Sequence, residues 1–390
     1  MSNLFFSYKN EILIFLFVTF NALLCVGLGL NVPVNSSLVI LVQALLFVFL
    51  CFWALRTCEL GWIDILLFFY IFIMSVLSLF VQDDMVVKDV FSMLILPISL
   101  LYFSKSNVNA WFVMRLLFFI ATFILILEVF LPELLIHFFP VGEYFLKTRD
   151  WVAEKNTVED VAFYIGSVRP GGYYFIPDVH RVGSIFLEPI TYSYFSLLVI
   201  LSARVFELNA WKKGVYVLVS VLAIILTDSR IAIFLAVLFS VMPLRNFRIY
   251  DSIFFYFIGI MSVMVVAWLL TDGSDSELPL RLGYTFNELT SGDAGTLLGL
   301  FPLLGKVNDS GYLLYISILG LPGLCILFLW IDRIAYVYWV GGVGRFFPAF
   351  YILLFVALFF GGAILSAKII VLMSALVTSL KPKNIQRKLL

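Results

Sequence analysis

Long apolar windows separated by short polar connections dominate the 390 residues of this chain. Most windows stay apolar for roughly 17–22 residues without alternating, which is the length of a helix that crosses a bilayer and excludes a membrane β-barrel. Because backbone groups in lipid must bond within their own segment, each window predicts a transmembrane helix. The predicted helices are Ile12–Leu30, Leu38–Leu55, Trp62–Val81, Val90–Phe103, Trp111–Leu131, Ile190–Phe206, Trp211–Thr227, Ile231–Leu244, Ser252–Thr271 and Gly311–Ile331, followed by one apolar run at Phe346–Leu380.

Positive charges indicate how these helices are oriented. Lys and Arg gather in alternate short connections, which the positive-inside rule assigns to the cytoplasm together with the N-terminus. A single helix over Phe346–Leu380 would leave the C-terminal cations outside, whereas a hairpin turning near Gly361–Lys368 returns them to the cytoplasm. We therefore predict an all-α polytopic membrane protein with about 12 transmembrane helices and both termini cytoplasmic. The cytoplasmic cations are Arg56, Lys105, Arg204, Lys212, Lys213, Arg245, Arg248, Arg333 and Arg345.

The composition supports a membrane protein, since 63% of the residues are hydrophobic and only 13% are charged. A soluble chain carries about twice that share of charge. No internal repeat and no soluble domain is apparent, so residues 1–390 are expected to form a single integral membrane domain. Two large loops are expected on the side opposite the cytoplasm, at residues 132–188 and 272–310. No cleavage site follows Ile12–Leu30, which we interpret as the first span and not as a signal peptide.

The four cysteines lie in the apolar windows or at their ends, and none lies in the two outer loops, so no structural disulfide is expected. No spacing of Cys, His or acidic residues is typical of a metal site. We expect membrane lipids as partners, and no metal, cofactor or nucleic acid.

The stretch His180–Pro189, HRVGSIFLEP, brings polar groups to the start of the helix predicted from Ile190. Arg181 and Glu188 are expected at the outer membrane boundary, and Pro189 suits the first turn of a helix. Two interpretations stay open. The stretch is either an ordinary helix start with Arg181 reaching toward lipid headgroups, or part of a catalytic site.

A tight turn, Thr227-Asp228-Ser229-Arg230, joins two later apolar windows on the same side of the membrane. An arginine in such a turn is costly unless it is paired with a carboxylate or an anionic ligand. Asp228 is one candidate partner. The alternative partner is a phosphate group, whose oxygens match the planar guanidinium.

The second outer loop carries further charges. Arg281 lies within it, and Asp309 stands directly before the helix start Gly311-Tyr312. Asp309 is either a helix N-cap or a functional carboxylate. Three outer connections thus each bring an arginine or a carboxylate to the same membrane depth. Together they favour a pocket for a diphosphate whose hydrocarbon tail lies in lipid.

Four motifs resemble those of a known family. They are Arg181-Val-Gly-Ser-Ile-Phe-Leu-Glu188-Pro189, Thr227-Asp-Ser229-Arg230, Pro302-Leu-Leu-Gly305 leading to Gly311-Tyr-Leu313, and Gly320-Leu-Pro-Gly323. With the topology, they are similar to those of the Wzy-type O-antigen and exopolysaccharide polymerases, which share a superfamily with the O-antigen ligases. The motifs cover the chain from about Arg169 to Gly323, and the rest is similar only in hydropathy.

The resemblance implies a glycosyltransferase-C-like helical fold in the bacterial inner membrane. Such proteins transfer a growing glycan from undecaprenyl diphosphate to a lipid-linked repeat unit at the periplasmic face, without a nucleotide sugar or a metal. The implied partners are this lipid-linked oligosaccharide and, as a candidate, a polysaccharide chain-length regulator. Similar ligases usually place a His just before the Tyr-Leu helix start. Here those positions are Asn308 and Asp309, which favours a polymerase.

Glycan transfer requires positive charge for the leaving diphosphate and a base for the acceptor hydroxyl. The paired-arginine spacing of some polymerases is found only in the second loop, between Arg281 and Gly292. The candidate substrate-binding residues are Arg181, Arg230 and Arg281 for the diphosphate and donor, with Arg169 and Tyr312 in addition. The candidate catalytic bases are Glu188 or Asp309, with His180 as the third choice.

Glu128 lies near the outer end of its predicted helix. Its carboxylate is expected either to pair with an arginine of the pocket or to lie at the end of the helix in contact with water. Two rival functions also stay open. One is a ligase that uses the same donor, and the other is a flippase for lipid-linked oligosaccharides. Flippases need charged or broken helices at mid-membrane, and the apolar windows here carry almost no such charge.

Overall fold

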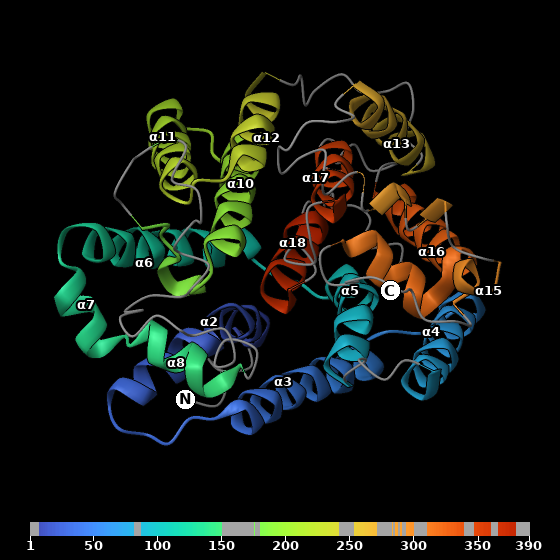
Figure 1. The fold of residues 1–390 in the computed structure, drawn as a ribbon, viewed down its shortest axis with the longest axis horizontal. Helices are drawn as coiled ribbons and strands as arrows, with labels where there is room; N and C mark the ends of the chain where they lie inside the picture. The colour runs from blue at the N-terminus through green and yellow to red at the C-terminus, as the bar shows by residue number, and fades with distance from the viewer. Residues whose placement is uncertain are drawn as a thin grey trace. The chain divides into compact units, whose positions relative to one another are not determined.

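The computed structural model is helical, and none of the residues that it describes lies in a β-strand (Figure 1). The all-α prediction is therefore confirmed for this part of the chain. Among the described helices, α2 (Lys9–Gly29), α3 (Ser36–Thr57), α6 (Ala110–Phe130), α10 (Pro189–Phe206) and α16 (Gly311–Tyr338) are long and apolar enough to cross a membrane. The described residues are 8–81, 87–149, 175, 180–241, 253–270, 283, 285–287, 289–290, 294–299, 310–338, 347–359 and 366–379.

Each predicted apolar window coincides with an observed helix. The windows outside those five long helices form α4 (Trp62–Val81), α5 (Val87–Lys105), α11 (Ala210–Leu226), α12 (Arg230–Val241), α13 (Ile253–Leu270), α17 (Phe347–Phe359) and α18 (Ala367–Ser379). The last apolar run contains two helices, α17 and α18, and residues 360–365 between them lie outside the described residues, so the predicted hairpin stays a prediction. Several of these helices are shorter than a bilayer requires, so the number of spans stays a prediction.

The chain divides into two compact units, which are described separately below. Unit 1 comprises Met1–Phe52, Ser106–Met242 and Ala367–Ser379, and unit 2 comprises Trp53–Lys105, Pro243–Ser366 and Leu380–Leu390. The candidate site residues of the first outer loop and of the Thr227–Arg230 turn belong to unit 1. That residues 1–390 form one integral membrane domain stays a prediction.

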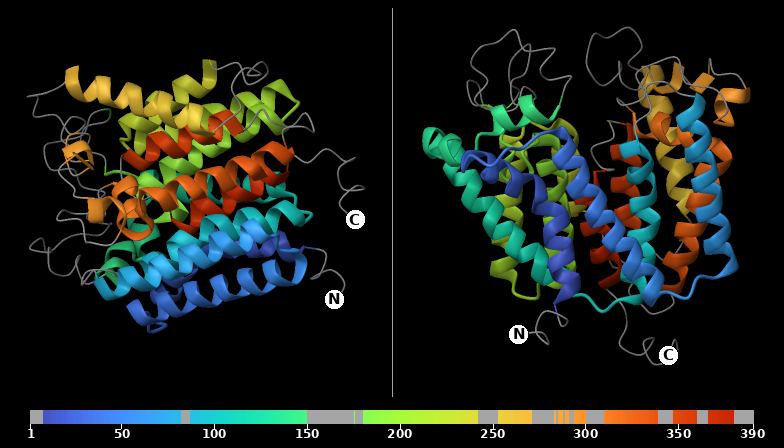
Figure 2. Two further views of the ribbon diagram at one scale, coloured as in Figure 1. Left: turned by 90° about the vertical axis from the view of Figure 1, so that its right-hand side faces the viewer. Right: turned by 90° about the horizontal axis from the view of Figure 1, so that it is seen from below.

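Helix α10 is the core of unit 1. Its side chains are buried almost without interruption from Thr191 to Ala203, and it contacts α6, α11, α12 and α18. Its buried side chains include several Ser, Thr and Tyr residues, which the neighbouring helices cover. Helices α2 and α6 pack against each other and against α18 (Figure 2). Unit 1 therefore fixes the position of the polar segment that leads into α10.

The outer loop at 132–188 begins with two short helices, α7 (Pro132–Phe138) and α8 (Val141–Thr148). Helix α8 packs against α2, and the Tyr144 hydroxyl donates a hydrogen bond to Asn21 Oδ1 at 2.9 Å. This contact anchors the end of α8, which Arg149 follows directly. Residues 150–174 and 176–179 of this loop, and most of the loop at 272–310, lie outside the described residues.

In unit 2, α16 is interrupted at Gly320, whose φ of 67° and ψ of 168° are not helical. Pro322 adds a second interruption because it has no backbone N–H group. The break leaves the Leu319 carbonyl to accept a hydrogen bond from the Tyr70 hydroxyl of α4 at 2.8 Å. The short helix α15 (Ala294–Leu297) packs against α16, and Leu298 lies against Gly320.

We expect Gly320→Ala to destabilise unit 2. A Cβ at this position would lie 2.6 Å from the Leu298 carbonyl carbon, and the positive φ strains any L-residue. Strain and overlap together should cost about 2–5 kcal/mol. Thermal unfolding of the detergent-purified protein measures the loss. The control is Gly259→Ala in α13, where an added Cβ has no neighbour within 4 Å, and an equal effect of both changes would contradict this packing.

Candidate functional site

The pre-α10 segment, which we define as His180–Glu188, has an unusual backbone. It contains the 3-10 turn η2 (Ser184–Phe186), and both Ser184 and Leu187 have positive φ angles, of 49° and 64°. Gly183 permits the tight fold, because a Cβ there would lie 2.6 Å from the Leu187 carbonyl carbon. Strained conformations of this kind persist only where surrounding contacts hold them, and they are common at functional sites.

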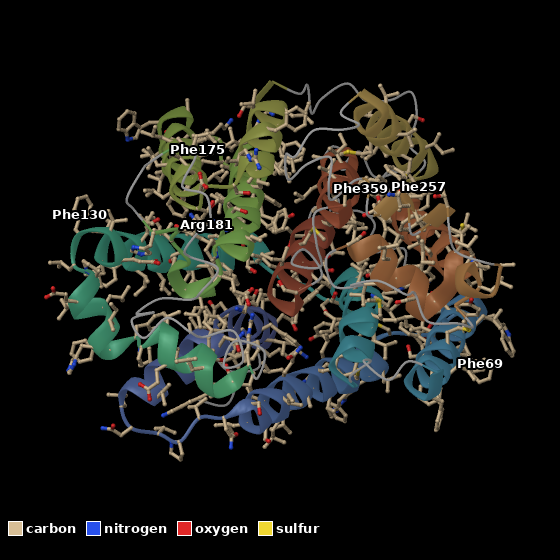
Figure 3. The ribbon with its side chains drawn as sticks, in the orientation of Figure 1. Phe69, Phe130, Phe175, Arg181, Phe257 and Phe359 are labelled. Carbon is tan, nitrogen blue, oxygen red and sulfur yellow. The ribbon has the colours of Figure 1, made fainter. Side chains whose placement is uncertain are left out.

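The pre-α10 segment packs directly on the turn between α11 and α12. The Val182 amide donates to the Leu226 carbonyl at 3.2 Å, and Arg181 Nε donates to the Thr227 carbonyl at 2.8 Å. Figure 3 labels the Arg181 side chain. Asp228 in this turn is buried, with a φ of 50°, and Arg230 is the first residue of α12. The structure thus brings together two of the three polar connections that the sequence predicted to form one site.

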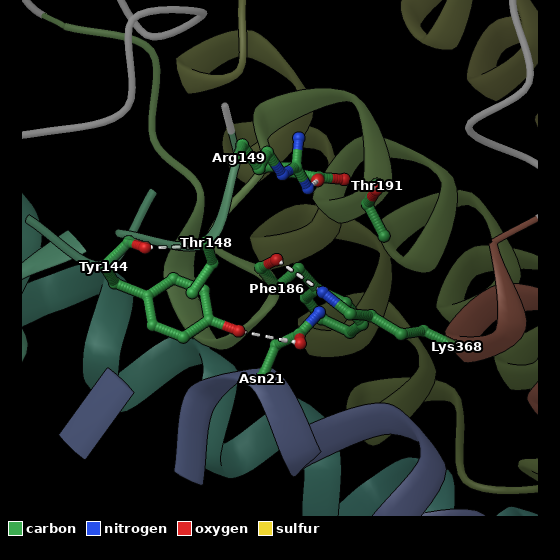
Figure 4. Close-up of polar contacts among 8 residues, drawn as sticks. Asn21, Tyr144, Thr148, Arg149, Phe186, Thr191 and Lys368 are labelled. Carbon is green, nitrogen blue, oxygen red and sulfur yellow. Dashed lines mark hydrogen bonds and ion pairs between the residues drawn. The ribbon is translucent and has the colours of Figure 1, made fainter. Parts of the chain in front are cut away.

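Glu188, the residue before α10, is paired with an arginine that the sequence analysis did not assign to the site. Its carboxylate accepts a hydrogen bond from Arg149 and another from Thr191 Oγ1 at 2.8 Å (Figure 4). Arg149 also lies over the Phe145 ring, with Cζ 4.4 Å from the ring centroid. The side chains of Glu188 and Arg149 retain 22% and 26% of their exposed area, so the pair borders the surface of unit 1.

These partners keep Glu188 ionised. Burial raises the pKa of Glu188, but the charges of Arg149 and Lys368 and the hydrogen bonds from Arg149 and Thr191 outweigh burial and lower it to about 2. A carboxylate with so low a pKa is a weak proton acceptor at neutral pH. The surroundings of Glu188 therefore favour an anchoring role over the predicted role of base.

We expect Glu188→Gln to remove a pH-dependent part of the stability. Because folding lowers the pKa from 4.5 to about 2, the ionised group stabilises the fold above about pH 4.5 and this contribution is lost as the pH falls toward 2. The shift corresponds to about 3 kcal/mol. Thermal unfolding from about pH 7 to about pH 3 should show a steeper loss for the wild type than for Glu188→Gln, with Glu143→Gln, which changes an exposed carboxylate, as control. Parallel curves for the wild type and Glu188→Gln would contradict the assignment.

Two buried charges hold the backbone of the pre-α10 segment. The carboxylate of Glu128, on α6, accepts hydrogen bonds from the amides of Gly183 and Ser184 and lies 3.4 Å from His180 Nε2. Lys368, on α18, donates to the Phe186 carbonyl at 2.9 Å (Figure 4). Among the described residues, Glu128 therefore pairs with two backbone amides and a histidine, and the arginine that the sequence analysis considered is not one of its partners.

Of the remaining predicted site residues, Tyr312 is the one that the structure describes. Tyr312 belongs to unit 2, where its side chain is completely buried and its hydroxyl donates to the Phe355 carbonyl at 3.1 Å. Such an engaged, buried hydroxyl is typical of a packed core residue and does not favour the predicted contact with substrate. Arg169, Arg281 and Asp309 lie outside the described residues, so their roles stay predictions.

The residues that the sequence analysis missed had only weak signals. Lys368 interrupts an apolar run, and a charge in such a run is by itself a sign of function, but we used it only to place a turn. Arg149 is one of several charges after α8 and has no distinguishing neighbour in the sequence. Comparison with protein-family models, curated proteins and solved structures gives no match for this chain. The function of this chain is therefore inferred from the chemistry of the site itself.

Proposed function

We propose that this chain is a polysaccharide polymerase. It would transfer glycan from an undecaprenyl-diphosphate-linked donor to a lipid-linked repeat unit at the periplasmic face of the bacterial inner membrane. The observation that carries the proposal is the contact between the pre-α10 segment and the α11–α12 turn, in which Arg181 Nε donates to the Thr227 carbonyl. This contact sets the Arg181 guanidinium beside the turn that carries Arg230.

Arg181 and Arg230, which come from these two contacting segments, suit a diphosphate leaving group. In the proposed step, an acceptor hydroxyl oxygen forms a bond to the anomeric carbon of the donor. The bond between that carbon and the phosphate oxygen breaks, and undecaprenyl diphosphate leaves with the bonding electrons. Arg181 and Arg230 stabilise the charge that develops on the diphosphate, because guanidinium groups bind phosphate oxygens in a planar fork. The hydroxyl proton passes to a base of the protein.

Among the three candidate bases, the surroundings of His180 support this role best. Its Nε2 atom lies 3.4 Å from the buried Glu128 carboxylate, and a carboxylate beside an imidazole is a common arrangement for a general base. The low pKa of Glu188 argues against it as the base. Asp309 lies outside the described residues and keeps its assignment from the sequence, as do Arg169 and Arg281.

The membrane setting completes the proposal. The turn η2 of the pre-α10 segment contacts α2, α6 and α10, which are long and apolar enough to cross a membrane. A donor bound at this segment would therefore keep its polyprenyl tail in the neighbouring lipid while the diphosphate meets the arginines. A glycosyltransferase-C-like fold of about 12 spans with both termini cytoplasmic belongs to the same proposal. A chain-length regulator is a proposed partner.

One observation favours a second candidate function. The break in α16 at Gly320 and Pro322 is of the kind that transporters use to build a binding site at mid-membrane. This supports a flippase for lipid-linked oligosaccharides as the alternative. A ligase that uses the same donor is the third candidate, since it would need the same arginines.

A deletion strain and a reconstitution separate the three candidates. Loss of a polymerase leaves lipid carrier bearing single repeat units on the periplasmic face. Loss of a ligase leaves finished, unattached polymer, and loss of a flippase leaves single repeats on the cytoplasmic face. Purified protein mixed with synthetic lipid-linked repeat units should yield a ladder of products. Absence of a ladder from folded protein would contradict the polymerase.

A further inference from the structure

Two opposite charges hold the pre-α10 segment from different helices. Glu128 comes from the last turns of α6, and Lys368 comes from the first turn of α18. Each retains only 5% of its exposed area. Buried charges of a membrane protein are costly and usually mark function. The contact of both charges with the same pre-α10 segment therefore needs an explanation.

Glu128 binds the N–H groups at the beginning of the turn. Its two carboxylate oxygens accept from the Gly183 amide at 3.0 Å and from the Ser184 amide at 2.8 Å. The Ser184 hydroxyl donates to the Ala121 carbonyl at 2.8 Å, which ties the same residue to α6 a second time. Hydrogen bonds with a charged partner are stronger than neutral ones, so this end of the turn is firmly fixed.

Lys368 binds the carbonyl at the other end of the turn. Its Nζ donates to the Phe186 oxygen at 2.9 Å, directly before the positive φ of Leu187. The charge of the same ammonium also lowers the pKa of Glu188. Lys368 thus acts on both the backbone and the acidic end of the segment.

We propose that Glu128 and Lys368 are positioning residues for the glycan transfer. From two helices they fix the pre-α10 segment in its strained conformation, so that Arg181 at its start and Glu188 at its end are held in place before substrate arrives. Preorganised groups are effective because no reorganisation is needed during the reaction. The assignment to glycan transfer rests on the proposed function, whereas the structural restraint of the pre-α10 segment by Glu128 and Lys368 does not.

Amide hydrogen exchange of the intact protein in lipid nanodiscs tests whether Glu128 and Lys368 restrain the pre-α10 segment. In Glu128→Gln and in Lys368→Met, the amides between Val182 and Leu187 should exchange faster than in the wild type by about 10-fold or more, because a charge-assisted hydrogen bond is lost. The matched controls are Glu143→Gln and Lys147→Met, which change an exposed ion pair on α8 and should leave the exchange unchanged. Wild-type exchange in both test variants would overturn the inference.

The catalytic consequence is tested with the reconstituted polymerase. Misplacement of the segment should lower kcat by about 100-fold and raise KM for the lipid-linked donor by up to about 10-fold, because Arg181 also binds the donor diphosphate. Lys368→Arg, which keeps the charge, should restore much of the rate. A purely structural role would instead reduce the amount of folded enzyme and leave kcat per folded molecule unchanged, which would also overturn the inference.

The two tests separate this inference from the proposed function. If exchange increases in the variants but the wild type makes no polymer, the segment is held as described and the polymerase assignment fails. If the wild type makes polymer and the variants match it in exchange and in kcat, the positioning role fails and the polymerase assignment stands.

Discussion

Arg230→Ala is expected to abolish polymer synthesis while the amount of protein in the membrane stays at the wild-type level. Arg230 begins α12, directly after the turn that accepts the Arg181 hydrogen bond, so its removal takes away positive charge where the diphosphate charge develops. The loss of one preorganised group of this kind lowers a rate by about 100–1000-fold. Product length on a gel, with the protein level measured in the same membranes, gives the result.

The matched control for this variant is Arg56→Ala. Arg56 is exposed at the end of α3, where its guanidinium lies 5.6 Å from the centroid of the Trp53 ring. The change removes the same charge from a position with no part in the proposed site, so polymer length should be unaffected. Wild-type polymer from Arg230→Ala would contradict the role of this arginine in binding the diphosphate.

Arg181→Lys is expected to lose nearly as much activity as Arg181→Ala. Lysine keeps the charge but has no Nε–H for the Thr227 carbonyl and no planar fork for the phosphate oxygens. The expected loss of kcat/KM is about 100-fold, the effect of removing one or two charge-assisted hydrogen bonds. Rates measured with synthetic lipid-linked repeat units provide the comparison.

The double variant Arg181→Ala/Arg230→Ala shows whether the two arginines act together. If both bind one diphosphate, the double variant should lose little more than the worse of the single variants, because groups that act as a unit are not additive. Independent, additive losses would show that the two arginines serve different steps.

Hydropathy was sufficient to predict the long apolar helices of this chain, but not the short helices α7, α8 and α15 in the outer loops. Each apolar window became a helix because a backbone in lipid has few other ways to satisfy its hydrogen bonds. The break in α16 was not predicted, although Gly320 and Pro322 stand close together in an apolar window. In a single sequence such a pair is also compatible with a continuous, kinked helix. The break requires the close approach of Leu298 to Gly320, which is a tertiary contact.

The candidate site was predictable only in part. The sequence predicted that Arg181 lies near the Thr227–Arg230 turn, because both connections fall on the same side of the predicted membrane, and the structure places them in contact. It did not predict the pairing of Arg149 with Glu188, because these residues lie 39 positions apart and meet only when α8 packs on α2. The low pKa of Glu188 follows from that pairing, so the sequence offered no reason to doubt Glu188 as a base.

The most direct test measures binding of undecaprenyl diphosphate to the purified protein, with the wild type compared to Arg181→Ala, Arg230→Ala and Arg56→Ala. If Arg181 and Arg230 together hold the diphosphate, each of their variants should bind it about 10-fold more weakly or worse, and Arg56→Ala should match the wild type. Equal affinity of all four proteins would contradict the proposal that these two arginines form a diphosphate site.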